Sequence, residues 1–333
     1  MSTTEAWAER ALVITDTRCL QHRPPPGMPE SPARLRSLLD GLGGRGVEIV
    51  DRADLDLSED AAARLASTVH DEKYLQRLRR AVQRGDGLID SADNPLSPGT
   101  WVATAAATAA LLDAVDRGLD LAAADDGAGA AVFAAVRPPG HHALADTAMG
   151  FCYVAHVAVA AQRLLERDEI DRVAILDFDV HHGNGTQALF FDRADVVFAS
   201  SHQWPFYPGT GAVGETGEGA GAGTTINRPL AAGAGDEEFL AAWDEILDQI
   251  DTVCGDTAPD CVLVSAGFDA WRDDPLGGLR VTEAGFRGVG ERLAQAADRW
   301  CGGRLVSTLE GGYDVDALPS LVAAYLEGLA KGR

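Results

Sequence analysis

The chain has 333 residues, of which 46% are apolar and 24% charged, and its formal net charge at pH 7 is -23. This acidic excess disfavours binding to nucleic acid phosphates, because like charges repel and no basic cluster interrupts the sequence. No apolar run is long enough to cross a bilayer, and the first ten residues lack the basic start and apolar stretch of a secretory signal, so we expect a cytoplasmic protein with no membrane partner.

The five cysteines are scattered, odd in number and without CxxC spacing. This distribution argues against a disulfide framework and against a thiolate metal site. The length suits one large α/β core, and we expect a single domain over residues 1–333 that can also form oligomers.

Short apolar runs alternate along the chain with amphipathic or alanine-rich stretches, which is typical of a parallel sheet covered by helices on both faces. The predicted strands are residues 12–15, 131–135, 173–176, 196–200, 261–265 and 305–308. The predicted helices are residues 100–115, 153–166, 236–250, 282–300 and 315–329. Residues 209–223 are rich in glycine but lack a P-loop lysine, so we expect a loop there. The fold class is therefore α/β, with three layers and a mostly parallel central sheet.

Polar residues follow three of the predicted strands directly. These segments are Arg-Pro-Pro-Gly-His-His at 137–142, Asp-Phe-Asp-Val-His-His at 177–182, and Gly-Phe-Asp at 267–269. Ligands of open α/β sheets bind beyond the carboxyl ends of the strands, so these segments are expected to form one site.

The second segment has the spacing of a metal site. Alternate side chains of an extended strand end share a face, so Asp177, Asp179 and His181 can point together. Asp269 adds a carboxylate from a neighbouring strand end, giving the composition of a catalytic zinc site with an open position. An ordinary surface turn is the alternative for a lone DxH, but charges that follow a buried strand need a partner, which a cation supplies.

His141 and His142 follow two prolines and a glycine, a stiff turn that can fix both rings beside the metal. Solvated loop histidines are the alternative for an isolated pair. Imidazole titrates near neutrality, so one ring can take a proton from metal-bound water and one can give a proton to a leaving amine.

Six motifs together resemble the histone deacetylase family, in the family's order and over practically the whole chain. They are RPPGHHA from Arg137, MGFC from Met149, DFDVHHGNGT from Asp177, YPGTG from Tyr207, SAGFDA from Ser265 and EGGY from Glu310. The HHGNGT and EGGY motifs resemble class II deacetylases and their bacterial relatives, the histone deacetylase-like amidohydrolases. The resemblance implies the arginase-deacetylase α/β fold.

The resemblance also implies two metal ions. Asp179, His181 and Asp269 correspond to the family's zinc ligands. A potassium ion beneath the zinc would use Asp177, His181 and Ser200 together with backbone oxygens.

For catalysis, the resemblance implies that His141 is the general base and His142 the electrostatic or acid partner. Asp177 would orient His141. Asn184 would contact His142 and, since class I relatives carry a carboxylate there, should lower the pKa of His142. Tyr313 resembles the tyrosine that donates a hydrogen bond to the substrate carbonyl, and the adjacent glycines favour this role over that of a core tyrosine.

For substrate binding, Phe151 and Tyr207 resemble the aromatic walls of an acyl-lysine tunnel, with Gly150 beside them, although ordinary packing stays open for Tyr207. Leu276 stands where polyamine-selective relatives carry a glutamate, which favours acyl-lysine. Asp93 aligns with a class I aspartate that grips the substrate backbone. The acidic segment 86–93, with Asp86, Asp90 and Asp93, is expected near the site mouth, where it would attract polycations.

The predicted function is therefore zinc-dependent removal of acetyl or other acyl groups from acyl-lysine or similar acylated amines, by metal-activated water. Acetylpolyamine hydrolysis is the alternative. An arginase-like ureohydrolase would need a second set of metal ligands, which is missing, and a non-catalytic reader of acyl-lysine would be expected to have lost a ligand, His141 or Tyr313.

Overall fold

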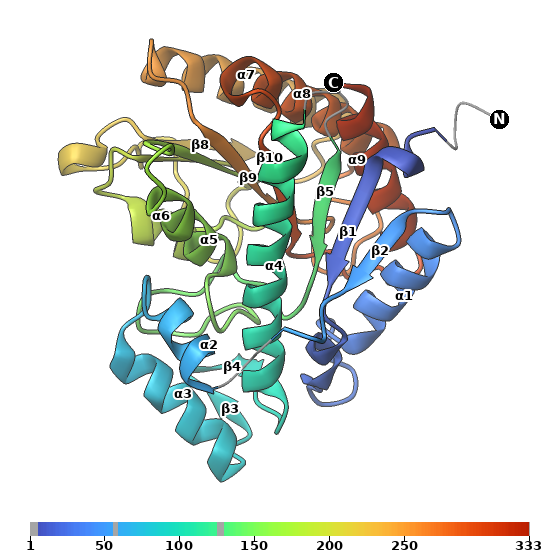
Figure 1. The fold of residues 1–333 in the computed structure, drawn as a ribbon, viewed down its shortest axis with the longest axis vertical. Coiled ribbons are helices and arrows are strands. Elements are labelled where there is room, and N and C mark those ends of the chain that lie inside the picture. The colour runs from blue at the N-terminus through green and yellow to red at the C-terminus, as the bar shows by residue number, and fades with distance from the viewer. Residues whose placement is uncertain (1–5, 56–58, 125–129, 333) are drawn as a thin grey trace.

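The computed structural model describes residues 6–55, 59–124 and 130–332. Within these residues, eight strands form one sheet in the order β2-β1-β5-β10-β9-β6-β7-β8, and all neighbouring pairs are parallel (Figure 1). The strands are β1 (Ala11–Thr15), β2 (Glu48–Asp51), β5 (Ala131–Ala135), β6 (Val173–Asp177), β7 (Val196–Gln203), β8 (Thr225–Leu230), β9 (Cys261–Ala266) and β10 (Leu305–Leu309).

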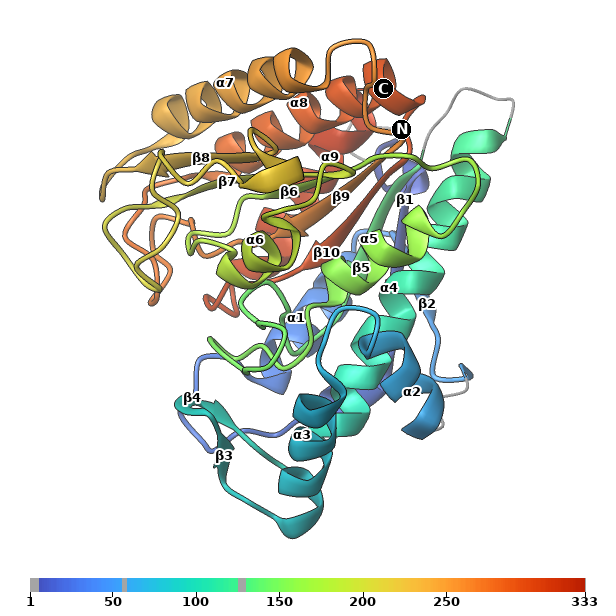
Figure 2. The same ribbon diagram turned by 90° about the vertical axis from the view of Figure 1, so that its left-hand side faces the viewer.

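Helices cover both faces of the sheet (Figure 2). One face carries α4 (Thr100–Ala123), α5 (His156–Leu165) and α6 (Asn184–Phe190). The other carries α1 (Pro32–Gly43), α7 (Asp236–Cys254), α8 (Glu283–Cys301) and α9 (Leu318–Lys331). The predicted three-layer α/β architecture with a parallel sheet is confirmed.

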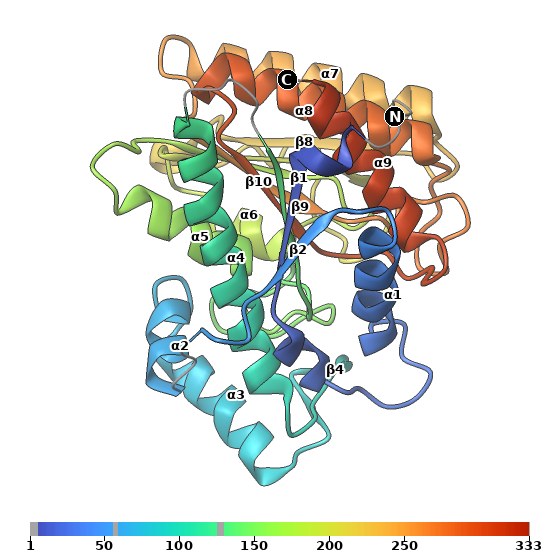
Figure 3. The same ribbon diagram turned by 45° about the vertical axis from the view of Figure 1, so that its right-hand side comes forward.

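A smaller group of elements lies at one end of the molecule (Figure 3). It contains α2 (Glu59–Ala66), α3 (Glu72–Arg84) and an antiparallel hairpin of β3 (Leu88–Ile89) and β4 (Ser91–Pro95). These elements share a second, smaller apolar core with α4 residues such as Trp101.

The four central strands β5, β6, β9 and β10 are buried along their whole length. A strand covered on both faces needs mainly apolar residues, which explains why β5 is apolar throughout and why β6 and β9 are apolar up to Asp177 and Ser265. The strand β10 also contains the buried Ser307 and Thr308. The small residues of α4 allow it to lie close to the sheet: a Cβ atom at Gly118 would be 2.5 Å from Val306 Cγ2.

All six predicted strands and all five predicted helices occur, with shifted ends. The helix predicted from residue 153 begins at His156, and the helix predicted from residue 315 begins at Leu318. The strands β2 and β8 were not predicted because they lie at the sheet edges, where a strand can be short, half exposed or contain a proline such as Pro229.

Residues 209–223 form the predicted loop, interrupted only by a 3-10 turn at Gly219–Gly221. Among the described helices, none has the length and apolar character needed to cross a membrane.

Candidate active site

Four loops meet at the carboxyl edge of the sheet, after the adjacent strands β5, β10, β9 and β6. They carry the side chains predicted for zinc and for the proton transfers, apart from Asp177 at the end of β6 and Asn184 at the start of α6. Ser200, predicted for potassium, lies in β7. Burial is nearly complete: His141 is 2% exposed, His142 3%, and Asp177, Asp179 and Asp269 are each 0% exposed. Polar groups buried to this extent must satisfy one another or hold a ligand.

Asp179, His181 and Asp269 form a cluster whose ligand atoms all lie within 4.8 Å of one another. Nδ1 of His181 is 3.1 Å from Asp179 Oδ1 and 3.2 Å from Asp269 Oδ2. Zinc bonds of about 2.0 Å in a tetrahedron place ligand atoms about 3.3 Å apart, so these two distances suit a metal between the three groups.

Two further observations support a cation at this cluster. Asp269 Oδ2 is buried and lacks a well-formed hydrogen bond, and a carboxylate oxygen in that state is available to a metal. Burial opposes the charge of His181, yet Asp179 and Asp269 outweigh it and raise the pKa of His181 to about 10. The two carboxylates thus favour positive charge between them.

Glycines allow the loops to approach this cluster closely. A Cβ atom at Gly311 would lie 2.0 Å from Asp269 Oδ2, and one at Gly267 would lie 2.1 Å from Asp179 Oδ2. Instead, the backbone N–H of Gly311 donates a hydrogen bond of 2.8 Å to Asp179 Oδ2. The glycines of EGGY and SAGFDA are therefore required by the packing around the carboxylates.

The two histidines lie side by side, with ring centroids 4.0 Å apart. His141 Nδ1 is 3.0 Å from Asp177 Oδ2, and His142 Nδ1 is 2.7 Å from Asn184 Oδ1. His141 therefore donates a hydrogen bond from Nδ1 to Asp177, and His142 donates one from Nδ1 to Asn184. The Nε2 atom of each ring is then available to bind or release a proton.

The surroundings of the two rings shift their pKa values in opposite directions. Burial disfavours the charged form of His141, but Asp179 and Asp177 outweigh it and raise the pKa of His141 well above its usual value. Burial and the neighbouring His141 and His181 hold the pKa of His142 well below its usual value. The pKa of His142 is low, as expected, but the cause is burial together with the neighbouring imidazoles, because the hydrogen bond to Asn184 raises this pKa.

Glu310 is a part of the site that the sequence reasoning missed, although it begins the EGGY motif. Its side chain is 1% exposed, and Oε2 accepts hydrogen bonds from the backbone N–H groups of Gly140 (2.7 Å) and His141 (3.1 Å). Oε1 is 3.2 Å from the Ser265 hydroxyl. Burial raises the pKa of Glu310 to about 7. Glu310 thus fixes the backbone of the histidine turn from β10.

Tyr313 stands beside Arg34, whose guanidinium carbon lies 4.7 Å from the centre of the tyrosine ring. Its backbone N–H donates a 2.7 Å hydrogen bond to Asp274 Oδ2. Burial raises the pKa of Tyr313 well above its usual value, so its hydroxyl keeps its proton and can donate it in a hydrogen bond.

His142, His181 and Tyr313 line a cavity of about 300 Å³. The residues that line it are Asp93, His142, Gly150, Phe151, His181, Phe206, Tyr207, Leu276 and Tyr313. All five predicted substrate-binding residues are therefore in this set. Phe206 was missed; its ring stacks on His181 with centroids 5.4 Å apart, and its position next to Tyr207 was the available signal.

Of the three aspartates predicted for an acidic rim, only Asp93 lines the cavity. Asp86 is paired with Arg84, and Asp90 Oδ1 lies 3.0 Å from Arg77 Nη1. Each of these carboxylates has its charge partly compensated by an arginine, so the segment is a weaker attractor for polycations than its aspartates predict. Asp93 faces the cavity.

Of the residues predicted for potassium, Asp177 and Ser200 are direct neighbours in the pairing of β6 with β7. Asp177 Oδ1 accepts a hydrogen bond from Asp179 N (3.1 Å), and the Ser200 hydroxyl is 2.9 Å from His202 Nδ1. The two side chains are close in the fold, and potassium binding by them stays a prediction.

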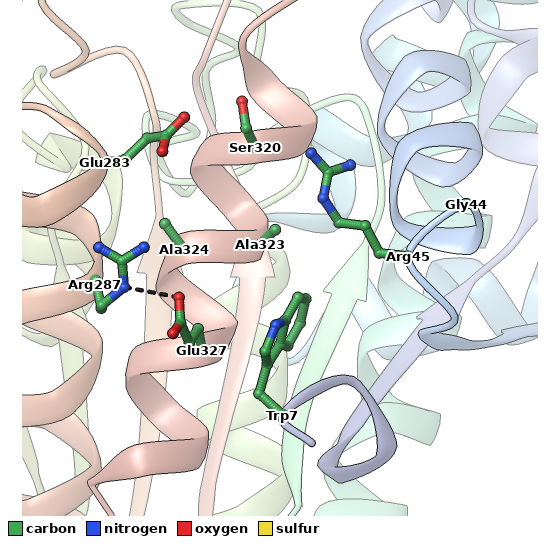
Figure 4. A pocket seen from close by; sticks show the side chains of 9 residues that line it. All are labelled: Trp7, Gly44, Arg45, Glu283, Arg287, Ser320, Ala323, Ala324 and Glu327. Carbon is green, nitrogen blue, oxygen red and sulfur yellow. Dashed lines mark hydrogen bonds and ion pairs between the residues drawn. The ribbon is translucent and has the colours of Figure 1, made fainter. Parts of the chain in front are cut away.

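A second cavity, of about 380 Å³, lies between the N-terminal segment, α1, α8 and α9 (Figure 4). Trp7 and two alanines line it together with two arginines and two glutamates, and Arg287 Nε donates a 2.8 Å hydrogen bond to Glu327 there. None of the residues with predicted catalytic roles lines this cavity.

Comparison with known proteins gives a match to the family model of the histone deacetylase domain over residues 28–329. The chain is 37% identical over 307 residues to the histone deacetylase-like amidohydrolase of Pseudomonas aeruginosa, covering 91% of this chain and 76% of that protein. It is 39% identical over 245 residues to the acetylpolyamine amidohydrolase of Mycoplana ramosa, covering 72% of this chain and 67% of that protein. The crystal structure of the HDA15 HD domain is similar, with a TM-score of 0.81, 30% identity and coverage of 97% of this chain and 89% of that one.

Proposed function

The chain belongs to the histone deacetylase family, and we propose that it is a zinc-dependent amidohydrolase that removes acyl groups from acyl-lysine side chains or similar acylated amines. The observation that carries this proposal is the convergence on one cavity of His181 from a metal-ligand cluster, His142 from an imidazole pair, and Tyr313.

In this proposal Asp179, His181 and Asp269 hold zinc, and Asp177 and Ser200 contribute to a potassium site. A bound zinc ion supplies a Lewis acid for the substrate carbonyl and lowers the pKa of a water molecule. The close spacing of the three ligand atoms supports the zinc assignment, and so does the buried Oδ2 of Asp269, which lacks a well-formed hydrogen bond.

His141 acts as the general base. Its Nδ1–H points to Asp177, so its Nε2 is the atom that takes a proton from the attacking water. The carboxylate of Asp177, 3.0 Å from Nδ1, stabilises the imidazolium that results. Asp177 is therefore the residue that orients His141 and fixes its tautomer.

His142 is held neutral by burial and by the positive character of its neighbours, with Asn184 setting its orientation. It acts as a hydrogen-bonding partner, and the proton that releases the amine comes from the protonated histidine of the pair. Tyr313 keeps its proton and donates a hydrogen bond to the oxygen that becomes negative in the transition state.

For the substrate, Phe151, Phe206 and Tyr207 offer ring faces to an aliphatic stem, and Leu276 gives the mouth an apolar residue. This favours acyl-lysine over an acylated polyamine, whose second ammonium would find no carboxylate at position 276. Acetylpolyamine hydrolysis is the second candidate, supported by the 39% identity to the Mycoplana ramosa enzyme.

The proposal also includes one deacetylase domain over residues 1–333, which the family match over residues 28–329 and one main hydrophobic core support. The net charge of -23 supports a partner other than nucleic acid. A cytoplasmic location stays a prediction from the sequence.

The test is to measure deacylation of an acetyl-lysine peptide, acetylputrescine and acetylspermidine side by side, after chelation and again after zinc is restored. We expect zinc-dependent turnover with preference for the peptide. Preference for the polyamines would select the second candidate, and absent or zinc-independent turnover of all three would contradict the proposal.

A further inference from the structure

The β3–β4 hairpin holds the loop that carries Phe151. Three hairpin side chains accept hydrogen bonds from three backbone N–H groups of this loop: Asp90 Oδ2 from Ala148 (2.8 Å), Asp93 Oδ2 from Gly150 (3.1 Å) and Asn94 Oδ1 from Phe151 (3.0 Å). We refer to Asp90, Asp93 and Asn94 as the hairpin clamp.

The loop needs such support because its backbone is unusual. Phe151 has φ +67° and Gly150 has φ +55°, both in the left-handed region that residues with a side chain rarely adopt. At Gly150 a Cβ atom would lie 2.3 Å from His142 Cδ2. The aromatic wall formed by Phe151 therefore depends on a strained turn pressed against a catalytic ring, and the hairpin clamp satisfies its N–H groups.

Asp93 also reaches the opposite wall of the cavity. The Tyr207 hydroxyl donates a 3.0 Å hydrogen bond to Asp93 Oδ2, and the Ser91 hydroxyl donates to Asp93 Oδ1. An ionised carboxylate has about four acceptor positions, and the Gly150 N–H, Tyr207 and Ser91 fill three of them. Both positions of Oδ2 are therefore used within the protein, and one position on Oδ1 is left for a further donor.

We propose that Asp93 is a positioning residue that joins the two aromatic walls, because its Oδ2 accepts hydrogen bonds from both Tyr207 and Gly150. In this role Asp93 acts on the binding of the acylated stem, and it does so equally for acylated primary amines with and without a peptide backbone. This inference rests on the proposed deacylase function for its kinetic test, and it assigns to Asp93 a role different from the one that the family resemblance implies.

The kinetic test compares two substrates with the same acylated stem: a capped peptide that contains acetyl-lysine, and N-acetyl-1-aminopentane, which has no backbone amides beyond the scissile one. The variants are Asp93→Ala, Asp93→Asn, Tyr207→Phe and the double variant Asp93→Ala with Tyr207→Phe. Asp86→Asn is the matched control, because it removes a charge from the segment before the hairpin without touching the cavity.

We expect Asp93→Ala to lower kcat/KM by about tenfold on both substrates, mainly through KM, because a wall that has lost its charged hydrogen bonds binds either stem less well. Tyr207→Phe should lower both by a smaller and again equal factor, and the double variant should be no worse than Asp93→Ala alone. A loss confined to the peptide in Asp93→Ala and Asp93→Asn, with Tyr207→Phe unchanged, would overturn the proposal.

Hydrogen exchange tests the same inference without catalysis. The amide of Gly150 should exchange faster in Asp93→Ala than in the wild type or in Asp86→Asn, because its acceptor is gone. Unchanged protection of Gly150 in Asp93→Ala would contradict the positioning role. If the wild type deacylates neither substrate, the proposed function fails, whereas the exchange measurement still decides the role of Asp93.

Discussion

The floor of the cavity and its mouth are built by different parts of the molecule. The floor is lined by His142, His181 and Tyr313, which come from loops that leave buried strands. His141, Asp177 and Glu310 do not line the cavity and are each no more than 2% exposed. The mouth comes from the β3–β4 hairpin, the loop after β7 and the segment after β9, and Tyr207 is 39% exposed. The buried floor suits the reaction chemistry, and the exposed mouth can vary to change substrate choice.

If the floor carries the chemistry, the largest effect should come from His141. His141→Ala removes the proposed general base and should lower kcat by about 10³-fold, within the range for general acid–base catalysis. Steady-state kinetics with the zinc-loaded enzyme measures this, with thermal unfolding as the control for folding. A loss of less than threefold would show that another group accepts the proton.

Tyr313→Phe keeps the ring beside Arg34 but removes the hydroxyl. Since one oxyanion donor contributes about 10²-fold or more to kcat, we expect a loss of that size with little change in KM. The same assay measures it. A change in KM alone would mean that Tyr313 contributes to binding of the substrate in its ground state and not to stabilisation of the transition state.

At the mouth, Leu276→Glu should change the choice of substrate more than the rate. A carboxylate at this half-buried position would attract the free ammonium groups of acetylspermidine and shift the ratio of kcat/KM values toward it by about fivefold. Leu276→Gln has nearly the same shape without the charge and is the matched control. If the two variants have the same ratio of kcat/KM values, the charge at position 276 does not cause the selectivity.

The buried His156 should make the free energy of unfolding depend on pH in the acid range. His156 is buried, with Nδ1 2.8 Å from the Thr108 hydroxyl and Nε2 3.2 Å from the Pro138 carbonyl oxygen, and burial lowers its pKa from 6.5 to about 4. Between these two values the unfolded chain binds a proton that the folded protein does not. The free energy of unfolding should therefore fall as the pH drops from 6.5 to about 4.

His156 alone would contribute a slope of up to about 1.4 kcal/mol per pH unit in that window. Denaturant unfolding of the wild type and of His156→Asn at several pH values measures the difference in slope. An identical slope in the two proteins would show that His156 is already protonated when folded.

The sequence predicted the central part of the fold because buried parallel strands are mainly apolar, as Val173–Asp177 is up to Leu176 and Cys261–Ala266 is up to Val264. It predicted the residues at the floor because their motifs follow these strands directly, and parallel strands bring their carboxyl ends to one edge. The edge strands β2 and β8 were missed, since a half-covered strand has no such requirement.

The sequence by itself determined which chemical groups are present. They are Asp177, Asp179 and His181 at alternate positions, the pair His141 and His142, and Tyr313 in a glycine-containing turn. Only the tertiary structure decided how these groups are held. Glu310 binds Gly140 across 170 positions of the chain, and Tyr207 binds Asp93 across 114. Such contacts join segments whose local patterns are independent, so no spacing in the sequence encodes them, and they exist only because packing of the sheet and hairpin brings the segments together.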